Sequence, residues 1–261
     1  MPLKLVSFLY EKLTPMISFI VIEYHSLEEI KDFIGYLSQT VSDLKYELII
    51  SSNSLYSKEK QKEILTDFSN TIWTFNEKNG GFAYGMNAGI KLAKGDILVI
   101  VNPDVKIKSS LKSMSSYLES HKRVGIIAPK IVDFDGIIQD SFRHFVTPWG
   151  FFARQVGWIK DKGELHVKDF REPVSGDWVI GAFMMCRRDF YEKVGGLSDD
   201  YFMYCEDMDW CRRAHKAGFE VVYFPETVIE YKGTRSARKS WKYAKIHIKS
   251  LLTYWRKYGI R

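Results

Sequence analysis

Residues 16–24 read MISFIVIEY, an apolar and β-branched run that stops at a polar cluster. This pattern predicts a buried strand, and the residues after it are typical of a helix. The same alternation continues along the chain, with a helix at 27–37, a strand at 46–50, a helix at 58–68, a short strand at 71–75, a helix at 84–93 and a strand at 96–101. Strands that alternate with helices predict βαβ units and a mostly parallel sheet, so we expect an α/β fold.

Polar residues follow three of the predicted strands. Tyr24, Asn53 and Asn102 stand at these ends, and ligands of such sheets bind beyond the carboxyl ends of the strands. The most abrupt of these strand ends lies in the run LVIVNPD at 98–104. There, Asp104 offers the hard oxygen ligand that Mg²⁺ or Mn²⁺ prefers. Taken alone, Asp104 fits a turn cap better than a metal ligand.

Three further segments combine residue types that could bind phosphate or place a carboxylate in a cleft. Each also has an ordinary structural interpretation: a tight turn, an acidic first helical turn or a solvated basic face. On a helix, Glu206 and Asp209 are neighbours, whereas Asp207 projects about 100° away. The segments are NGGFAYGMNAG at 79–89, which contains Gly85 and Asn87 and whose helix N-terminus suits phosphate; YFMYCEDMDWCRR at 201–213; and the basic stretch at 232–245 with the phosphate-matching Arg235 and Arg238.

Composition limits the class of protein. The 261 residues suffice for one large domain, and 38 Lys+Arg against 32 Asp+Glu leave a net charge of +6, which suits a phosphate-bearing ligand, a nucleic acid or an anionic membrane. The three cysteines form no disulfide framework or zinc motif, which favours a reducing cytoplasm. Lys4, Glu11 and Lys12 interrupt any signal peptide, and no run approaches transmembrane length.

In their order and spacing, these segments resemble family 2 glycosyltransferases of the GT-A fold, most closely the rhamnosyltransferase-like branch. The resemblance runs from 17 to 236 and includes Gln139 after the turn at 135–136, the motif at 181–183 and the glycines at 195–196. It implies a Rossmann-like, mostly parallel central sheet flanked by helices, with a small mixed-sheet acceptor region. The expected organisation is a single domain at 1–240, with a nucleotide-binding half at 16–105 and an acceptor-side half at 106–240, and a basic aromatic helical tail at 241–261.

The resemblance also implies roles for individual residues. Asn102 and Asp104 stand at the family's DxD position, where the last carboxylate holds the metal, and Asp207 stands at the position of the general base. Trp178 and Gly181 would lie near the sugar, with Glu206 and Asp209 on the acceptor side. Three positions depart from the family pattern: His25 replaces Asn, Ser52 replaces an Asp that holds the base or ribose, and Glu230 replaces a metal-binding His. Glutamate is itself a hard ligand, so Glu230 is expected to share the metal.

The implied activity is metal-dependent, inverting transfer from a nucleoside diphosphate sugar, with dTDP-L-rhamnose first and UDP-sugars second. The acceptor would be a saccharide or a lipid-linked saccharide in surface polysaccharide synthesis. We expect a cytoplasmic protein. Its tail at 241–261 has the composition of an interfacial helix at the inner face of the membrane, although packing on the domain or in a homodimer is an equal alternative.

Three rival functions remain at this point. A nucleotidyltransferase should carry a Gly-rich loop after its first strand, but residues 23–29 contain no glycine. A catalytically decayed sugar-nucleotide-binding module fits the departures at Ser52 and Glu230, although Asp104 and Asp207 are retained. A nucleic-acid binder suits the pI near 9.0 but not the acidic cluster at 206–209.

Overall fold

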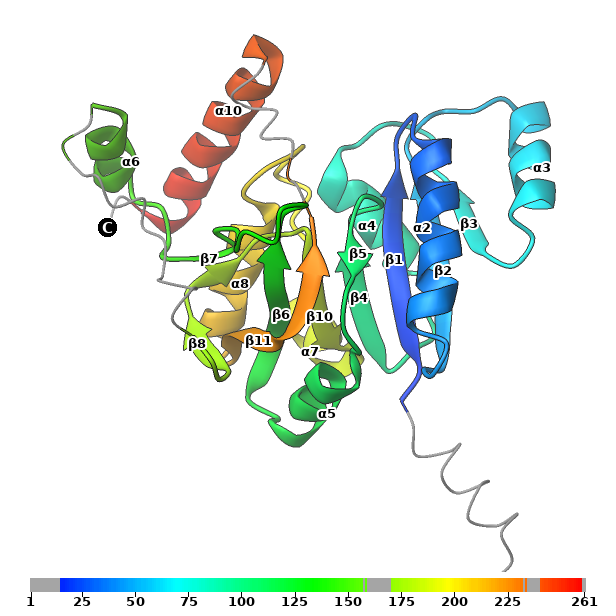
Figure 1. Ribbon diagram of the computed structural model, residues 1–261. Coiled ribbons are helices and arrows are strands. Elements are labelled where there is room, and N and C mark those ends of the chain that lie inside the picture. Colours follow the sequence, from blue (N-terminus) through cyan, green and yellow to red (C-terminus); the bar gives the residue numbers. More distant parts are fainter. Residues whose placement is uncertain (1–14, 157, 159–169, 232, 234–239, 260–261) are drawn as a thin grey trace, which may run out of the picture.

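The computed structural model describes residues 15–156, 158, 170–231, 233 and 240–259 (Figure 1). Helices and strands alternate in its first half, as the hydrophobic pattern predicts. The elements are β1 (Ile17–Glu23), α2 (Leu27–Thr40), β2 (Tyr46–Ser52), α3 (Lys58–Asp67), β3 (Ile72–Phe75), α4 (Phe82–Ile90), β4 (Ile97–Val101), β5 (Lys106–Ile107), α5 (Lys112–Ser120), β6 (Val124–Val132), β7 (Phe142–Arg143), α6 (Pro148–Gln155), β8 (Val174–Gly176), β9 (Trp178–Val179), β10 (Phe183–Arg187), α7 (Arg188–Val194), α8 (Glu206–Lys216), β11 (Glu220–Glu230) and α10 (Trp241–Tyr258).

One nine-stranded sheet joins both halves of the chain. Its strand order is β3-β2-β1-β4-β10-β6-β11-β5, and β8 pairs with β11 beside this path. The strands from β3 to β4 are parallel, whereas β10 runs antiparallel to both β4 and β6. The predicted mostly parallel sheet is confirmed in the first half. Because β10 is reversed, it begins at the edge where β1, β2 and β4 end.

Two hydrophobic cores cover the two faces of this sheet. Strand β1 supplies Phe19 to one core and Ile20 to the other, since successive side chains point to opposite faces. Helices α2 and α5 bury Phe33 and Met114 in the first core. Helices α4, α7 and α8 close the second. A strand buried on both faces reads as a continuous apolar run, which is why MISFIVIEY is recognisable.

The region at 133–177 contains both the small β7–β9 sheet and an additional helix, α6. Helix α6 escapes sequence analysis because it has only eight residues and includes a Gly, which is a poor helix former. It lies beside α10 at one side of the molecule (Figure 1). Within the described ranges, the helices include none long and apolar enough to span a membrane.

Candidate functional site

Two hydrogen bonds bring the strand end with Asp104 and the helix start with Asp207 to one edge of the sheet. The backbone N–H of Asn102 donates to the carbonyl of Ala182 at 3.0 Å, where β10 begins beside the end of β4. The next residue back, Gly181, donates its N–H to Asp207 Oδ2 at 2.8 Å. The two carboxylates predicted to hold the metal and to act as base therefore belong to one connected frame.

An uncommon backbone conformation aims the start of α8 at this edge. Tyr204 and Cys205 have positive φ angles of 71° and 68°, which non-glycine residues rarely adopt. Such conformations cost of order 1–3 kcal/mol each and gather at functional sites. They turn the chain so that Asp207 reaches back to Gly181, while its Oδ1 accepts the N–H of Met208 at 2.7 Å.

The three carboxylates of the acidic cluster lie in different environments. Asp207 is partly exposed, whereas Glu206 and Asp209 are buried. Burial raises the pKa of Glu206 well above its ordinary value, and the adjacent charge of Asp207 adds to the rise. Burial raises the pKa of Asp207 as well, but hydrogen bonds from Gly181 and Met208 oppose the rise. Asp207 is thus the accessible carboxylate of the cluster, poised to bind a proton more readily than an ordinary aspartate.

Asp209 is enclosed by protein groups. Its carboxylate accepts hydrogen bonds from the hydroxyls of Tyr201 at 3.2 Å and Tyr258 at 2.7 Å and from Arg213 Nε at 2.8 Å. Lys257 of α10 completes the set at 2.9 Å. The family resemblance implies that Asp209 lies on the acceptor side. Because its carboxylate is already bound by these protein groups, we assign Asp209 a structural role.

Asp104 follows β4 on the exposed edge. Desolvation by neighbouring groups raises the pKa of its carboxylate, and the charge of Glu29 in the first turn of α2 adds to the rise. Beside it, Asn102 donates to the hydroxyl of Tyr231 at 3.2 Å. Burial, followed by the charge of Asp104, raises the pKa of Tyr231 to about 12, so that its phenol is neutral near pH 7. The charges of Asp104 and Glu29 thus act on each other at this edge, and a cation bound there would relieve their repulsion.

Glu230 makes other contacts. Its carboxylate pairs with Lys106 at 3.8 Å and Lys108 at 3.6 Å. Side chains alternate along an extended chain, so Glu230 faces away from the side on which Tyr231 meets Asn102. We therefore do not assign Glu230 to the metal. No group of three His, Cys, Asp or Glu side chains with metal-binding spacing occurs among the described residues.

A cluster of hydroxyl groups surrounds a buried carboxylate at the end of β1. Glu23 accepts hydrogen bonds from Ser52 at 2.5 Å, Ser54 at 2.8 Å and Tyr56 at 3.0 Å. The hydroxyl of Ser52 is thus already hydrogen-bonded within the protein. Where the family pattern has an Asp at position 52, this protein has a carboxylate from Glu23 of β1. The cluster fixes Tyr56 at the wall of a cavity.

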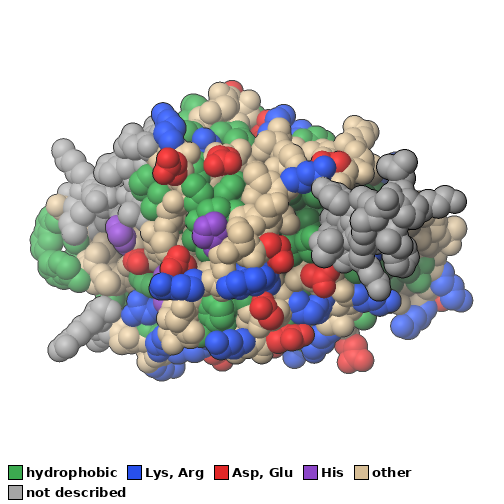
Figure 2. Space-filling model, turned by 90° about the horizontal axis from the view of Figure 1, so that it is seen from below, with side chains coloured by type: hydrophobic (Ala, Val, Ile, Leu, Met, Phe, Trp, Pro, Cys, Tyr) green, Lys and Arg blue, Asp and Glu red, His purple; other side chains and the backbone are tan. Residues whose placement is uncertain are grey.

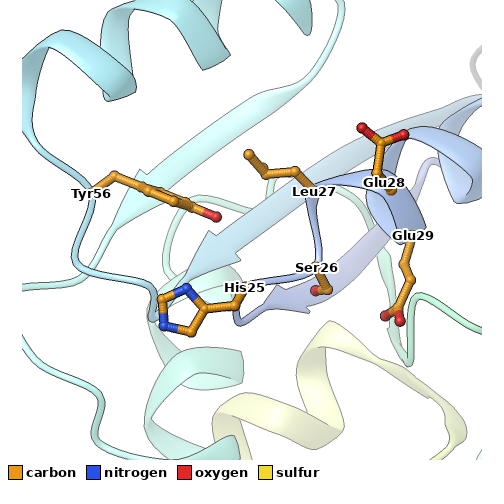
Figure 3. Close-up of a pocket in the computed structure, with 6 residues that line it drawn as sticks. All are labelled: His25, Ser26, Leu27, Glu28, Glu29 and Tyr56. Atoms are coloured by element: carbon orange, nitrogen blue, oxygen red, sulfur yellow. The ribbon is translucent and has the colours of Figure 1, made fainter.

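This cavity of about 410 Å³ opens between the end of β1 and the start of α2 (Figure 3). The exposed ring of Tyr24 lies against His25 with a centroid distance of 4.5 Å. The cavity is lined by His25, Ser26, Leu27, Glu28, Glu29 and Tyr56. Aromatic rings beside a polar cavity at a strand end suit a planar ligand. Sequence reasoning placed Tyr24 here but did not identify Tyr56, because its partner Glu23 is distant in sequence.

The glycine-rich segment at 79–89 serves mainly to join the two halves. Asn53 donates to the carbonyl of Gly81 at 3.0 Å, and Asn87 donates to the carbonyl of Leu197 at 2.7 Å and accepts its N–H. A Cβ at Gly85 would meet Ile22 at 2.5 Å, so this glycine lets α4 approach β1. Contacts within the protein therefore account for the presence of Asn53, Gly85 and Asn87 at these positions without a bound ligand.

We predict that Gly81→Ala will destabilise the protein by at least about 3 kcal/mol, because Gly81 has a φ of +91° and its Cβ would lie 1.9 Å from the carbonyl oxygen of Phe202. Denaturant unfolding measures the change. The matched control is Gly35→Ala in α2, where nothing lies within 4 Å of the new Cβ and a gain of roughly 0.5–1 kcal/mol is expected. Equal effects of the two substitutions would contradict the close contact.

Arg143 is a site residue that sequence reasoning missed. It lies on β7 opposite Trp178, with its guanidinium 5.6 Å from the centre of the indole, and its charge opposes the rise in the pKa of Asp207. Trp178 is itself buried and donates to the carbonyl of His144. Arg143 Nε and Ser141 Oγ are buried without a hydrogen-bond partner among the described residues. The guanidinium of Arg143 also pairs with Asp140, so its positive charge is held near Asp207 by protein contacts.

Arg235 and Arg238, predicted to bind the diphosphate, lie outside the described residues. The structure therefore brings together Tyr24, Asn102, Asp104, Gly181 and Asp207 at one edge of the sheet. It adds Tyr56, Arg143 and Tyr231 to them.

Residues 18–195 match the sequence model of glycosyl transferase family 2. The chain belongs to this family. A second match, to the N-terminal domain of galactosyltransferase, covers residues 163–236. The family 2 match includes both the Asp104 strand end and the Gly181 turn, so the frame described above lies mostly within it.

Curated relatives of this family 2 protein include rhamnosyltransferases. The rhamnosyltransferase WbbL of Escherichia coli is 26% identical over 245 residues, covering 90% of this chain and 91% of that protein. The N-acetylglucosaminyl-diphospho-decaprenol L-rhamnosyltransferase of Mycobacterium tuberculosis is 28% identical over 165 residues, covering 59% of this chain and 53% of that protein. A low-salt glycan biosynthesis hexosyltransferase of Haloferax volcanii is 26% identical over 212 residues, covering 78% of this chain and 63% of that protein. The predicted rhamnosyltransferase-like branch is confirmed, although the chain spans less than two thirds of the mycobacterial and haloarchaeal relatives.

Solved glycosyltransferases share the fold of this family 2 protein. GalNAc-T7, crystallised with UDP, GalNAc and Mn²⁺, has a TM-score of 0.63 and 14% identity, covering 86% of this chain and 44% of that chain. The mannosyltransferase PcManGT of Pyrobaculum calidifontis, in complex with GDP-Man and Mn²⁺, has a TM-score of 0.55 and 14% identity, covering 84% of this chain and 57% of that chain. At this identity the likeness shows the fold, and the predicted GT-A fold is confirmed.

Proposed function

We propose that the protein transfers a sugar from a nucleoside diphosphate donor to an acceptor hydroxyl, with inversion at the anomeric carbon. The observation that supports this proposal most strongly is a pair of hydrogen bonds. Through Asn102 and Gly181, they connect the strand end that bears Asp104 to the helix start that bears Asp207. The donor we infer is dTDP-L-rhamnose, because rhamnosyltransferases are among the curated relatives. The acceptor is a saccharide or a lipid-linked saccharide of a surface polysaccharide.

In this mechanism Asp207 takes the proton from the acceptor hydroxyl. The acceptor oxygen then forms its bond to the anomeric carbon on the face opposite the diphosphate, and the bond to the diphosphate oxygen breaks with its electron pair. Hydrogen bonds from Gly181 and Met208 hold the carboxylate in place for this proton transfer. The positive charge of Arg143 acts on Asp207 and favours its deprotonated, proton-accepting form.

Asp104 would hold a Mg²⁺ or Mn²⁺ ion. The negative charge of Glu29, which acts on this carboxylate, supports cation binding. Magnesium sites of this kind use one or two carboxylates and complete their coordination with substrate phosphates. When bound, the ion supplies positive charge that stabilises the departing diphosphate. The cavity beside Tyr24 and Tyr56 would accept the nucleobase, because its aromatic walls suit a flat heterocycle.

The experiment that tests the function measures transfer and binding separately. The protein is incubated with Mn²⁺ and dTDP-L-rhamnose or UDP-sugars, and thermal shift reports binding while acceptor glycosylation reports transfer. Product with inverted anomeric configuration supports the proposal. Donor binding without transfer or hydrolysis, with every acceptor tried, would instead identify a binding module.

We predict that Asp104→Asn will remove the Mn²⁺ dependence of donor binding and lower turnover by roughly 10²–10³-fold, because charge developing on the diphosphate loses its counter-ion. Titration of donor with and without Mn²⁺, followed by thermal shift, measures the first effect. Asp32→Asn, an exposed substitution in α2, is the control and should leave Mn²⁺ dependence intact. Unchanged Mn²⁺ dependence in Asp104→Asn would remove Asp104 from this role.

A further inference from the structure

Three aromatic rings form an exposed cluster around α6. Trp149, Phe152 and Trp158 are 63%, 50% and 68% exposed. They nevertheless contact one another, with centroids 5.9 Å apart for the two tryptophans and 6.1 Å for Phe152 and Trp158. Large rings are normally buried, and a contiguous exposed group of them marks an interaction surface.

A second exposed apolar stripe runs along α10. Trp241, Ile248 and Leu252 are 84%, 52% and 53% exposed. Their spacings of seven and four residues place them on one side of the helix. Exposed cations flank the stripe along the helix: Lys245, Lys249 and Arg256. Helix α10 contains no acidic residue, so its outer face is both apolar and positively charged.

The cluster and the stripe stand on two helices that pack against each other. The ring of Trp255 in α10 packs against Phe151 of α6 at a centroid distance of 5.8 Å, and its Nε1–H donates to the carbonyl of Val146 at 2.8 Å. Trp255 is three residues after Leu252 and so borders the stripe. The two helices lie side by side in Figure 1, and Figure 2, which views the molecule from below, shows hydrophobic side chains at its left edge, the side on which α6 lies in Figure 1. We call this surface, formed by Trp149, Phe152, Trp158, Trp241, Lys245, Ile248, Lys249, Leu252 and Arg256, the α6–α10 face.

The inner side of α10 is attached to the segment that leads into α8. Ser250 donates to the carbonyl of Met203 at 2.8 Å, and the ring of His247 lies 5.0 Å from that of Tyr204. Tyr204 is three residues before Asp207. A partner bound to the α6–α10 face would therefore contact the helix that packs against the segment leading into Asp207.

We propose that the α6–α10 face binds the surface of a bilayer that contains anionic phospholipid. Tryptophan and phenylalanine partition into the interface between headgroups and acyl chains, and flanking lysines and arginines are attracted to anionic lipid. A second copy of the chain fits less well. A two-fold dimer would place this face against itself, and its cations would then repel one another. Binding to vesicles does not depend on the transfer reaction, so it can fail or succeed independently of the proposed function.

The experiment is flotation of the full-length protein with vesicles of phosphatidylcholine alone or with added phosphatidylglycerol. Wild-type protein is expected to float with the anionic vesicles. The triple variant Trp149→Ala, Phe152→Ala, Trp158→Ala should bind at least about a hundredfold more weakly, because three large apolar side chains no longer enter the interface. Lys245→Gln with Lys249→Gln should weaken binding roughly thirtyfold, or about fivefold per charge. The matched control, Lys58→Gln with Lys62→Gln, removes two exposed lysines of α3 at the other end of the molecule (Figure 1).

Circular dichroism and thermal unfolding show that each variant is folded. The double lysine variant provides a second test should the aromatic variant be unstable. Wild-type protein that stays unbound, or α6–α10 variants that float like the α3 control, would overturn the proposal. Sedimentation velocity supplies the alternative outcome: concentration-dependent dimers that the triple variant abolishes, without vesicle binding, would show that the face is a protein interface.

Discussion

Asp207→Asn will lower the rate of sugar transfer by roughly 10²–10⁴-fold, the range typical of a lost general base. Asparagine keeps the shape of the side chain and can still accept the N–H of Gly181, but it cannot take the acceptor proton. Donor binding should remain close to that of the wild type, because Asp207 acts on the acceptor. Transfer assays with the preferred donor, together with donor titration by thermal shift, separate the two effects.

The control for this prediction is Asp67→Asn, the same chemical change at an exposed position at the end of α3. It should leave both transfer and binding unchanged. If Asp207→Asn retained turnover near the wild-type rate, Asp207 would not be the base, and the proposed mechanism would have to be abandoned.

The pH dependence of kcat/KM tests the same role. A general base works in its deprotonated form, so the rate falls as pH decreases through the pKa of Asp207. Because burial raises this pKa, the acid limb of the profile should lie above the ordinary aspartate value of about 3.9. This acid limb should be absent from the pH profile of the residual kcat/KM of Asp207→Asn.

Asp209→Ala will destabilise the folded protein by about 3–5 kcal/mol, because a fully buried carboxylate is removed from a network of charged and hydroxyl groups. Arg213 and Lys257 lose their shared counter-ion, and the buried hydroxyl of Tyr201 loses its acceptor. For a chain of this size the melting temperature should fall by roughly 10 °C. Denaturant unfolding and calorimetry measure the change.

The matched control is Asp200→Ala. Asp200 also pairs with Lys257, at 3.2 Å, but its side chain is mostly exposed. Exposed ion pairs contribute about 0–1 kcal/mol, so this substitution should cost little. A small effect of Asp209→Ala, similar to that of the control, would show that Asp209 is not the structural link between α8 and α10.

The strand ends were predictable because their signals are local. An apolar, β-branched run that stops at a polar residue marks a buried parallel strand, and parallel strands of one sheet end at the same edge. Tyr24, Asn102 and Asp104 could therefore be placed near one another from the sequence. The resemblance to family 2 glycosyltransferases added Asp207 and Gly181, whose proximity no local pattern reveals.

Contacts between distant segments determined the remaining roles. Asp207 and Asp209 are two residues apart in one acidic run, yet only the packing of Tyr201 and Tyr258 around Asp209 shows which carboxylate is enclosed. The lysines beside Glu230 and the ring of Trp178 beneath Arg143 are likewise supplied by neighbouring strands. The sequence by itself determined the sheet, its binding edge and the family. Only the tertiary structure decided which polar side chains are already satisfied by the protein and which are left for a ligand, because that depends on partners brought together by folding.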